Sequence, residues 1–230
     1  MHALPHLSTL DWLSLTVFFA CWGGYAWFSE HSAGGAGGLI RTSQRYRLDW
    51  AYRMLERDVR VTDSTLIGNL MTSVSFYAYT TIYIIAGLVA ALGAADQLLG
   101  FAADLPFAGP GNRELLEIKL MLVLASFVFA YFKFTWSLRQ FNILSILVGA
   151  APTGSAGDPA IDRYARRVAG TNTLAGDDFN RGIRGYYFGL AAAGWLLHPL
   201  ILGGLALAVC GILYRRDYRS AALAVLRDNA

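Results

Sequence analysis

The sequence has little charge for its length. Asp, Glu, Lys and Arg together make up 15% of the 230 residues, whereas hydrophobic residues make up 55%. Soluble domains carry roughly 25% charged residues, so the deficit indicates a membrane protein. The formal net charge is only +3, and we expect no nucleic-acid partner.

Cysteine and lysine are also scarce. The two cysteines, Cys21 and Cys210, lie in apolar segments, where we expect buried thiols rather than a disulfide or a metal site. Lysine occurs only at positions 119 and 133, and every other basic residue is arginine. The N-terminus has no basic region and no small-residue cleavage site, so we expect the first apolar stretch to be retained as a span.

Long apolar runs dominate the rest of the chain. A helix of about 20 apolar residues crosses the roughly 30 Å of bilayer hydrocarbon. The runs predict an all-α fold, a polytopic membrane helical bundle forming a single domain over residues 1–230. Its four transmembrane helices are expected at residues 7–28, 65–92, 114–148 and 180–214. Pro199 predicts a kink in the last of them.

Two segments between the predicted spans are basic and amphipathic. Residues 39–60 and 158–170 place arginines opposite apolar side chains, a pattern typical of helices that lie on an anionic leaflet. For residues 39–60 the alternative is a helix packed against the ends of the bundle. The candidate lipid-contacting residues are Arg45, Arg47, Arg53, Arg57, Arg163, Arg166 and Arg167.

The third predicted span carries polar side chains on one narrow stripe. Lys119, Ser126, Lys133 and Gln140 recur every seven residues, and Ser137 falls beside them. A lysine inside an apolar segment costs about 3 kcal/mol or more, so the stripe should face protein or water rather than lipid. Snorkelling of Lys133 toward the interface is the alternative.

The second and fourth predicted spans also carry polar residues. The stripe on the second span should either meet the lysine stripe or line one aqueous space with it. Residues 171–182 read as a polar loop, where Asp177 and Asp178 would be solvated or capping. For His198, beside Pro199, bonding to carbonyls freed by the kink is a better interpretation than metal ligation. These further polar candidates are Asn69, Thr72, Ser73, Thr80, Arg184 and His198.

The distribution of arginine predicts the orientation. The connectors after the first and third predicted spans hold more basic residues than the opposite side, which places both connectors in the cytoplasm and both termini outside. The basic C-terminal tail runs against this assignment.

Four blocks of sequence resemble a known family. They are RDVRVTDSTLIGNL (57–70), EIKLML (117–122), YFKFTWSLRQFNILSILVGAAP (131–152) and FNRGIRGYYFGLAAAGWLLHP (179–199). Together they resemble a family of integral membrane proteins catalogued as domain of unknown function 599, over about residues 7–219. The resemblance implies a multi-pass membrane protein of bacteria or their relatives and supplies no catalytic residues.

Two functional hypotheses follow. The first is a homo-oligomeric channel with an anion preference, lined by the polar residues of the second and third spans, because positive groups in a narrow passage attract anions. The second is a structural or regulatory protein that organises anionic lipid or partner proteins and has no transport activity. We expect no enzyme and no cofactor, because the spans contain no paired carboxylates and no HExxH or GxSxG motif. The expected location is the bacterial inner membrane.

Overall fold

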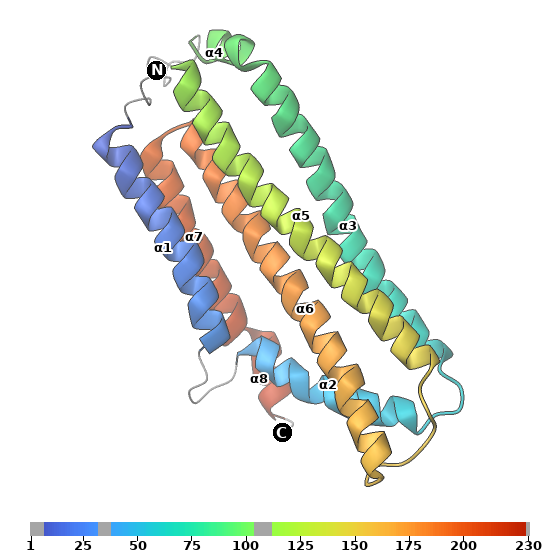
Figure 1. Cartoon of the computed structure of the whole chain (residues 1–230). Helices are drawn as coiled ribbons and strands as arrows, with labels where there is room; N and C mark the ends of the chain where they lie inside the picture. The colour runs from blue at the N-terminus through green and yellow to red at the C-terminus, as the bar shows by residue number, and fades with distance from the viewer. Residues whose placement is uncertain (1–6, 32–37, 104–111, 229–230) are drawn as a thin grey trace. The chain divides into compact units, whose positions relative to one another are not determined.

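The computed structural model describes residues 7–31, 38–103 and 112–228. Every regular element in these ranges is helical, so the predicted all-α fold is confirmed (Figure 1). The elements are α1 (Thr9–His31), α2 (Leu39–Leu55), α3 (Val61–Gly93), α4 (Ala95–Ala103), α5 (Arg113–Gly149), α6 (Pro159–Ala193), the 3₁₀ helix η1 (Gly194–Leu196), α7 (Pro199–Tyr218) and α8 (Ala221–Asp228).

The length of α5 follows from its sequence. No glycine or proline interrupts it before Gly149, where it ends. At its start the Asn112 Oδ1 atom accepts a hydrogen bond from the Glu114 amide at 3.0 Å, and the Glu114 carboxylate lies in the first turn, where the helix dipole favours negative charge. The helix therefore extends over 37 residues, well beyond the number that crosses a bilayer.

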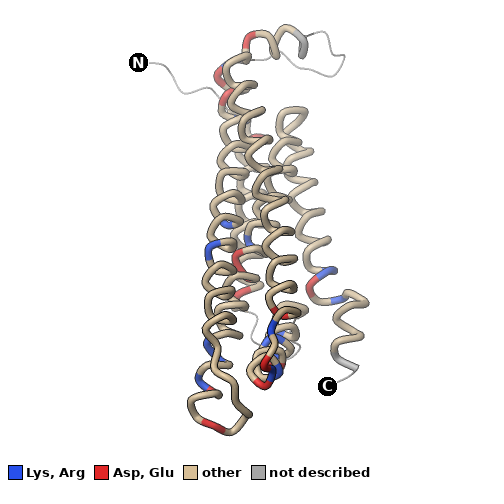
Figure 2. The backbone as a smooth tube through the Cα atoms, turned by 90° about the vertical axis from the view of Figure 1, so that its right-hand side faces the viewer, with Lys and Arg blue, Asp and Glu red and all other residues tan. Residues whose placement is uncertain are grey.

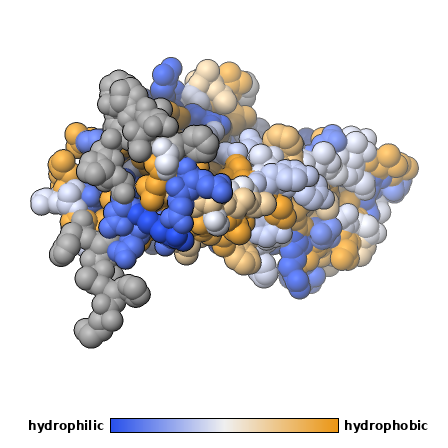
Figure 3. Space-filling model, turned by 90° about the horizontal axis from the view of Figure 1, so that it is seen from above, coloured by the Kyte–Doolittle hydropathy of each residue, from blue (hydrophilic) through white to orange (hydrophobic). Residues whose placement is uncertain are grey.

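Three helical stretches in the described residues are long and apolar enough to cross a membrane: Val61–Gly93, Arg113–Gly149 and Pro199–Leu226. Most residues of each are not buried within the chain, and Figure 3 shows hydrophobic side chains reaching the surface between hydrophilic patches. This chain is therefore a membrane protein with transmembrane helices. The predicted first span, now α1, is not among the three because its Trp and Tyr residues lower its mean hydropathy.

The prediction of a single helix over 180–214 is wrong. Helix α6 ends at Ala193, η1 follows, and α7 begins at Pro199 and runs back alongside α6 and α1 (Figure 1). Pro199 has no N–H to donate and its ring clashes with the preceding turn, so the helix cannot continue through it. The expected kink is instead a reversal of the chain.

The prediction of a separate short helix at 158–170 is also wrong. Helix α6 begins at Pro159 and continues through the polar residues 171–182, where we expected a loop. The physical reason is that several of these polar side chains, including Asn172 and Asp178, are buried against neighbouring helices. Tertiary partners thus offset the weak helix propensity of this stretch.

The described residues divide into two compact units. Unit 1 takes in the described residues of Met1–Ser32, Thr80–Ala130 and Ile183–Leu213; unit 2 takes in those of Ala33–Tyr79, Tyr131–Gly182 and Tyr214–Ala230. Helices α3, α5, α6 and α7 each contribute one part to unit 1 and another part to unit 2.

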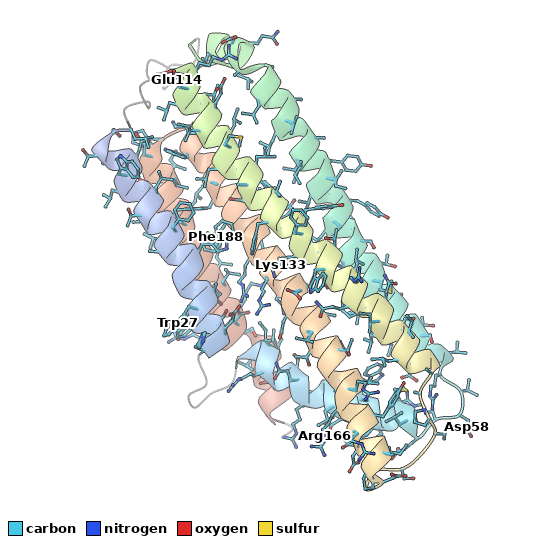
Figure 4. The ribbon with its side chains drawn as sticks, in the orientation of Figure 1. Trp27, Asp58, Glu114, Lys133, Arg166 and Phe188 are labelled. Carbon is cyan, nitrogen blue, oxygen red and sulfur yellow. The ribbon has the colours of Figure 1, made fainter. Side chains whose placement is uncertain are left out.

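The core of unit 1 is aromatic. The rings of Trp22 and Phe188 stack with centroids 5.5 Å apart, and Phe18 meets Phe188 edge to face at 5.8 Å. Phe188 is completely buried (Figure 4). Helix α6 lies close to α5 here because two of its glycines face phenylalanine rings of α5: an added Cβ atom would be 2.8 Å from the Phe129 ring at Gly185 and 3.0 Å from the Phe127 ring at Gly189.

Unit 2 joins its amphipathic helix to the bundle through a buried carboxylate. Asp63, in the first turn of α3, is completely buried and accepts hydrogen bonds from Trp50 Nε1 and Arg57 Nη1, each at 2.8 Å. Arg60 donates to the Pro152 carbonyl at 2.8 Å, which ties the start of α3 to the α5–α6 connection. These contacts hold α2 in place at the end of unit 2.

Candidate functional site

A group of charged side chains is enclosed between α5 and α6 in unit 2. The Asp178 carboxylate lies 3.1 Å from the Lys133 ammonium and 3.4 Å from Arg181 Nη1. It also accepts a hydrogen bond from Gln140 Nε2. We call these four residues the Asp178 cluster; Lys133 is labelled in Figure 4, on α5 beside α6.

Helical spacing assembles the cluster. Lys133, Ser137 and Gln140 fall on one face of α5, and Ser137 Oγ donates to the Ala175 carbonyl of α6 at 2.7 Å. That bond places the next turn of α6, with Asp178, opposite Lys133 and Gln140. The Lys133 ammonium therefore faces protein, as the cost of exposing it to lipid predicts.

The cluster sets one buried carboxylate against two cations. The side chain of Asp178 is 7% exposed, whereas that of Lys133 is 29% exposed. The Gln140 Oε1 atom is buried and has no hydrogen-bond partner among the described residues. A buried charged group on a helix that is apolar enough to cross the bilayer is a candidate for function, and removing one member leaves an uncompensated buried charge.

A second polar site in unit 2 involves α2. Arg47 Nη1 donates to the Asn172 carbonyl of α6 at 3.3 Å. Gly176 leaves room for this guanidinium, because an added Cβ would collide with it. Burial lowers the pKa of Arg47, and the Asp177 carboxylate opposes that shift. Arg47 is thus turned inward, toward α6.

Arg47 also lines a pocket of about 480 Å³ between α2 and α3. We call it the α2–α3 pocket. Its lining residues are Ser43, Tyr46, Arg47, Trp50, Leu66, Ile67, Asn69, Leu70, Ser73 and Asn172.

The polar stripe predicted on the second span does not meet the lysine stripe in unit 2. Asn69, Thr72 and Ser73 are exposed, and the two hydroxyls donate to carbonyls of their own helix at 2.9 and 3.0 Å. Lys133 faces Asp178 instead, because a carboxylate is a stronger partner for an ammonium than a hydroxyl. The expectation that the two stripes meet is therefore corrected for this part of the chain.

The remaining polar candidates lie in unit 1. Lys119 sits 5.8 Å from the centre of the Trp195 ring, and the Trp195 indole donates to the buried Asp11 carboxylate at 2.7 Å. Arg184 donates to Ser29 Oγ at 2.7 Å. The hydroxyl of Ser126 is buried and bonds to the Leu122 carbonyl of its own helix, and Thr80 is half-buried.

His198 stabilises the start of α7. Its Nδ1 atom accepts a hydrogen bond from the Leu200 amide at 3.2 Å, and backbone amides at a helix start have no partner within the helix. We had expected His198 to bond instead to backbone carbonyls freed by the kink. Among the described residues, no group of three His, Cys, Asp or Glu could hold a metal ion. Cys21 and Cys210 are free thiols, half-buried between α1 and α7.

The predicted lipid-contacting arginines separate into two groups. Arg57 pairs with Asp63 and Arg47 turns toward α6, so both have partners within the chain. The others are exposed on α2 and the first turns of α6, where basic residues gather toward the bottom of Figure 2. We call these five the basic surface: Arg45, Arg53, Arg163, Arg166 and Arg167.

Sequence reasoning missed three buried carboxylates: Asp11, Asp63 and Asp178. Asp178 lay in the stretch 171–182, which we expected to be a loop. One signal in the sequence points to Asp178. A lysine within an apolar helix requires a counter-charge, and the acidic pair closest in sequence to the last predicted span lies in residues 171–182.

Comparison with known proteins places the chain in a family but supplies no function. No curated protein and no solved structure matches it. The family model described as "Protein of unknown function, DUF599" matches residues 13–222, nearly the whole chain. The chain therefore belongs to the DUF599 family, as the four sequence blocks indicate.

Proposed function

We propose that this protein is a non-catalytic integral protein of the bacterial inner membrane that gathers anionic lipid around itself. The observation that carries the proposal is the basic surface of unit 2, whose five arginines are exposed beside α3 and α5, two helices apolar enough to cross the bilayer. Each basic residue near an anionic leaflet contributes about 1 kcal/mol of attraction. By the positive-inside rule, the same arginines favour a cytoplasmic location for this side.

The structure also changes the balance between the two hypotheses from the sequence. Anion preference depended on lysines lining a passage without counter-charges. Lys133 has Asp178 within 3.1 Å, and Lys119 packs on Trp195 near the Asp11 carboxylate. Paired cations attract a passing anion less strongly than isolated ones. Lipid organisation depends on exposed arginines and is not weakened in this way.

The lipid surrounding the purified protein tests this proposal. The protein is extracted with its native lipid into polymer-bounded discs, and the share of anionic headgroups is compared with that of the whole membrane. We expect enrichment for the native chain and its loss when Arg45, Arg53, Arg163, Arg166 and Arg167 are all changed to Gln. Changing the same five to Lys is the matched control, because it keeps the charge. Equal enrichment in the Gln variant would contradict the proposal.

A homo-oligomeric, anion-preferring channel is the second proposal. It is favoured by the partial exposure of Lys133, whose side chain is 29% exposed while its partner is almost enclosed. Reversal potentials across liposomes under a chloride gradient test it, with Lys133→Ala expected to reduce anion preference and Lys133→Arg to keep it. Unchanged selectivity in the Ala variant, or no conductance in any form, would remove the proposal.

A further inference from the structure

We infer that the α2–α3 pocket is a binding site for one anionic phospholipid, with the lipid phosphate at Arg47 and an acyl chain along α3. This inference rests on the proposed function and makes it specific, because it assigns one lipid to one site. The pocket lies entirely within unit 2, and its volume of about 480 Å³ is within the usual range for small-ligand sites.

The pocket has one polar end. Arg47 is the only charged residue in its lining, and Ser43 and Asn172 stand beside it. A guanidinium has five N–H donors, and among the described residues Arg47 uses one of them, in a long bond of 3.3 Å to the Asn172 carbonyl. The remaining donors can bind a phosphate in the bidentate manner that arginine favours. The Asp177 carboxylate close by limits the net charge, which suits a single phosphate rather than a multiply charged ligand.

The opposite wall belongs to a membrane helix and is mainly apolar, with Asn69 and Ser73 beside its aliphatic side chains. Leu66 and Leu70 of α3 line the pocket and are 48% and 44% exposed. They lie on a helix that is apolar enough to cross the bilayer and has little of its surface covered by the chain. A soluble phosphate compound would leave this wall in water, whereas an acyl chain covers it. The combination of one cation and an apolar strip therefore selects a lipid.

Two aromatic side chains hold the pocket open. Trp50 donates its indole N–H to Asp63 at 2.8 Å, and the Tyr46 hydroxyl donates to the Leu226 carbonyl of α8 at 3.1 Å. Both side chains are thus held by partners outside the pocket lining, so the site is largely formed before a ligand arrives. Trp and Tyr are also the residues that prefer the level of the lipid headgroups.

Native mass spectrometry of the full chain in detergent tests the site. The protein is titrated with phosphatidylglycerol or phosphatidylcholine, and the population carrying exactly one retained lipid is measured. We expect one tightly held phosphatidylglycerol. Arg47→Gln should weaken its retention about tenfold or more, because hydrogen bonds to a charged group are lost. Arg41→Gln removes the same charge from an exposed position of α2 outside the pocket and should have little effect.

A second, steric variant distinguishes loss of lipid binding from a folding defect of Arg47→Gln. Asn69 is exposed and lines the pocket, so Asn69→Trp should fill the site while leaving the packing of α3 intact. We expect it to lose the single lipid with an unchanged thermal unfolding curve. Retention of the lipid by both variants would overturn the inference, as would displacement of the lipid by millimolar inorganic phosphate.

The two proposals fail separately. Equal bulk anionic enrichment in the five-arginine Gln variant, with the single lipid still retained, would overturn the proposed function and leave the pocket standing. Persistent enrichment in the native chain without a retained lipid would overturn the pocket alone.

Discussion

The cores of the two units are built from different interactions. Unit 1 packs aromatic rings against glycines and carries isolated polar contacts such as the one between Asp11 and Trp195. Unit 2 concentrates paired charges, around Asp178, Asp63 and Arg47. The difference shows that apolar packing dominates the core of unit 1, whereas buried charges and their partners are concentrated in unit 2.

The largest expected effect tests the aromatic core of unit 1. Phe188→Ala removes a completely buried ring that contacts Phe18 and Trp22, and should lower the free energy of unfolding by about 4 kcal/mol. Leu190→Ala on the same helix is the control, because Leu190 is 50% exposed and should cost far less. Unfolding in a fixed detergent, followed by tryptophan fluorescence, measures both. Equal losses would show that this core is not the main source of stability.

The next effect tests the charged core of unit 2. Asp178→Ala leaves Lys133 and Gln140 without their shared acceptor, and should lower the free energy of unfolding by about 3 kcal/mol. The double change Asp178→Ala with Lys133→Met should recover part of that loss, because it removes the stranded charge. If the double variant were less stable than the single one, the stranded ammonium would not be the cause.

A smaller effect tests the isolated polar contact in unit 1. Trp195→Phe removes the indole donor and leaves the Asp11 carboxylate short of a partner, at a cost of about 2 kcal/mol. Trp12→Phe is the control, because Trp12 is 61% exposed. An equal, small effect at both positions would mean that this hydrogen bond adds little to the packing of unit 1.

The smallest effects compare two glycines of α6 within unit 2. At Gly182 an added Cβ would lie 2.5 Å from the buried Phe134 ring, whereas at Gly170 it would meet nothing within 4 Å. We expect Gly182→Ala to destabilise by about 1–3 kcal/mol and Gly170→Ala to stabilise by about 0.5–1 kcal/mol, since alanine is the better helix former. Thermal unfolding distinguishes these opposite signs. A shift in the same direction at both positions would contradict the described packing of α6 on Phe134.

Much of the fold could be predicted from local pattern. The long apolar runs predicted α3 and α5 to within a few residues, because segments of that length and composition are stable in lipid wherever they occur. The inward direction of Lys133 also followed from the cost of leaving an ammonium among acyl chains. Helix α6 could not be predicted in this way, since its polar stretch is stabilised by distant partners: Arg47 of α2 donates to the Asn172 carbonyl, and Lys133 of α5 donates to Asp178.

The sequence by itself determined that this chain is helical, enters a membrane and carries its charges in a few places, because hydrophobicity and its period are properties of each segment alone. Only the tertiary structure decided which carboxylate meets Lys133, that the chain reverses at Pro199, and that Arg47 turns toward α6 while Arg45 stays exposed. Those outcomes depend on distances between residues far apart in the chain. The partner of a buried charge is determined by its distance and by the cost of desolvation, not by the neighbouring residues in the sequence.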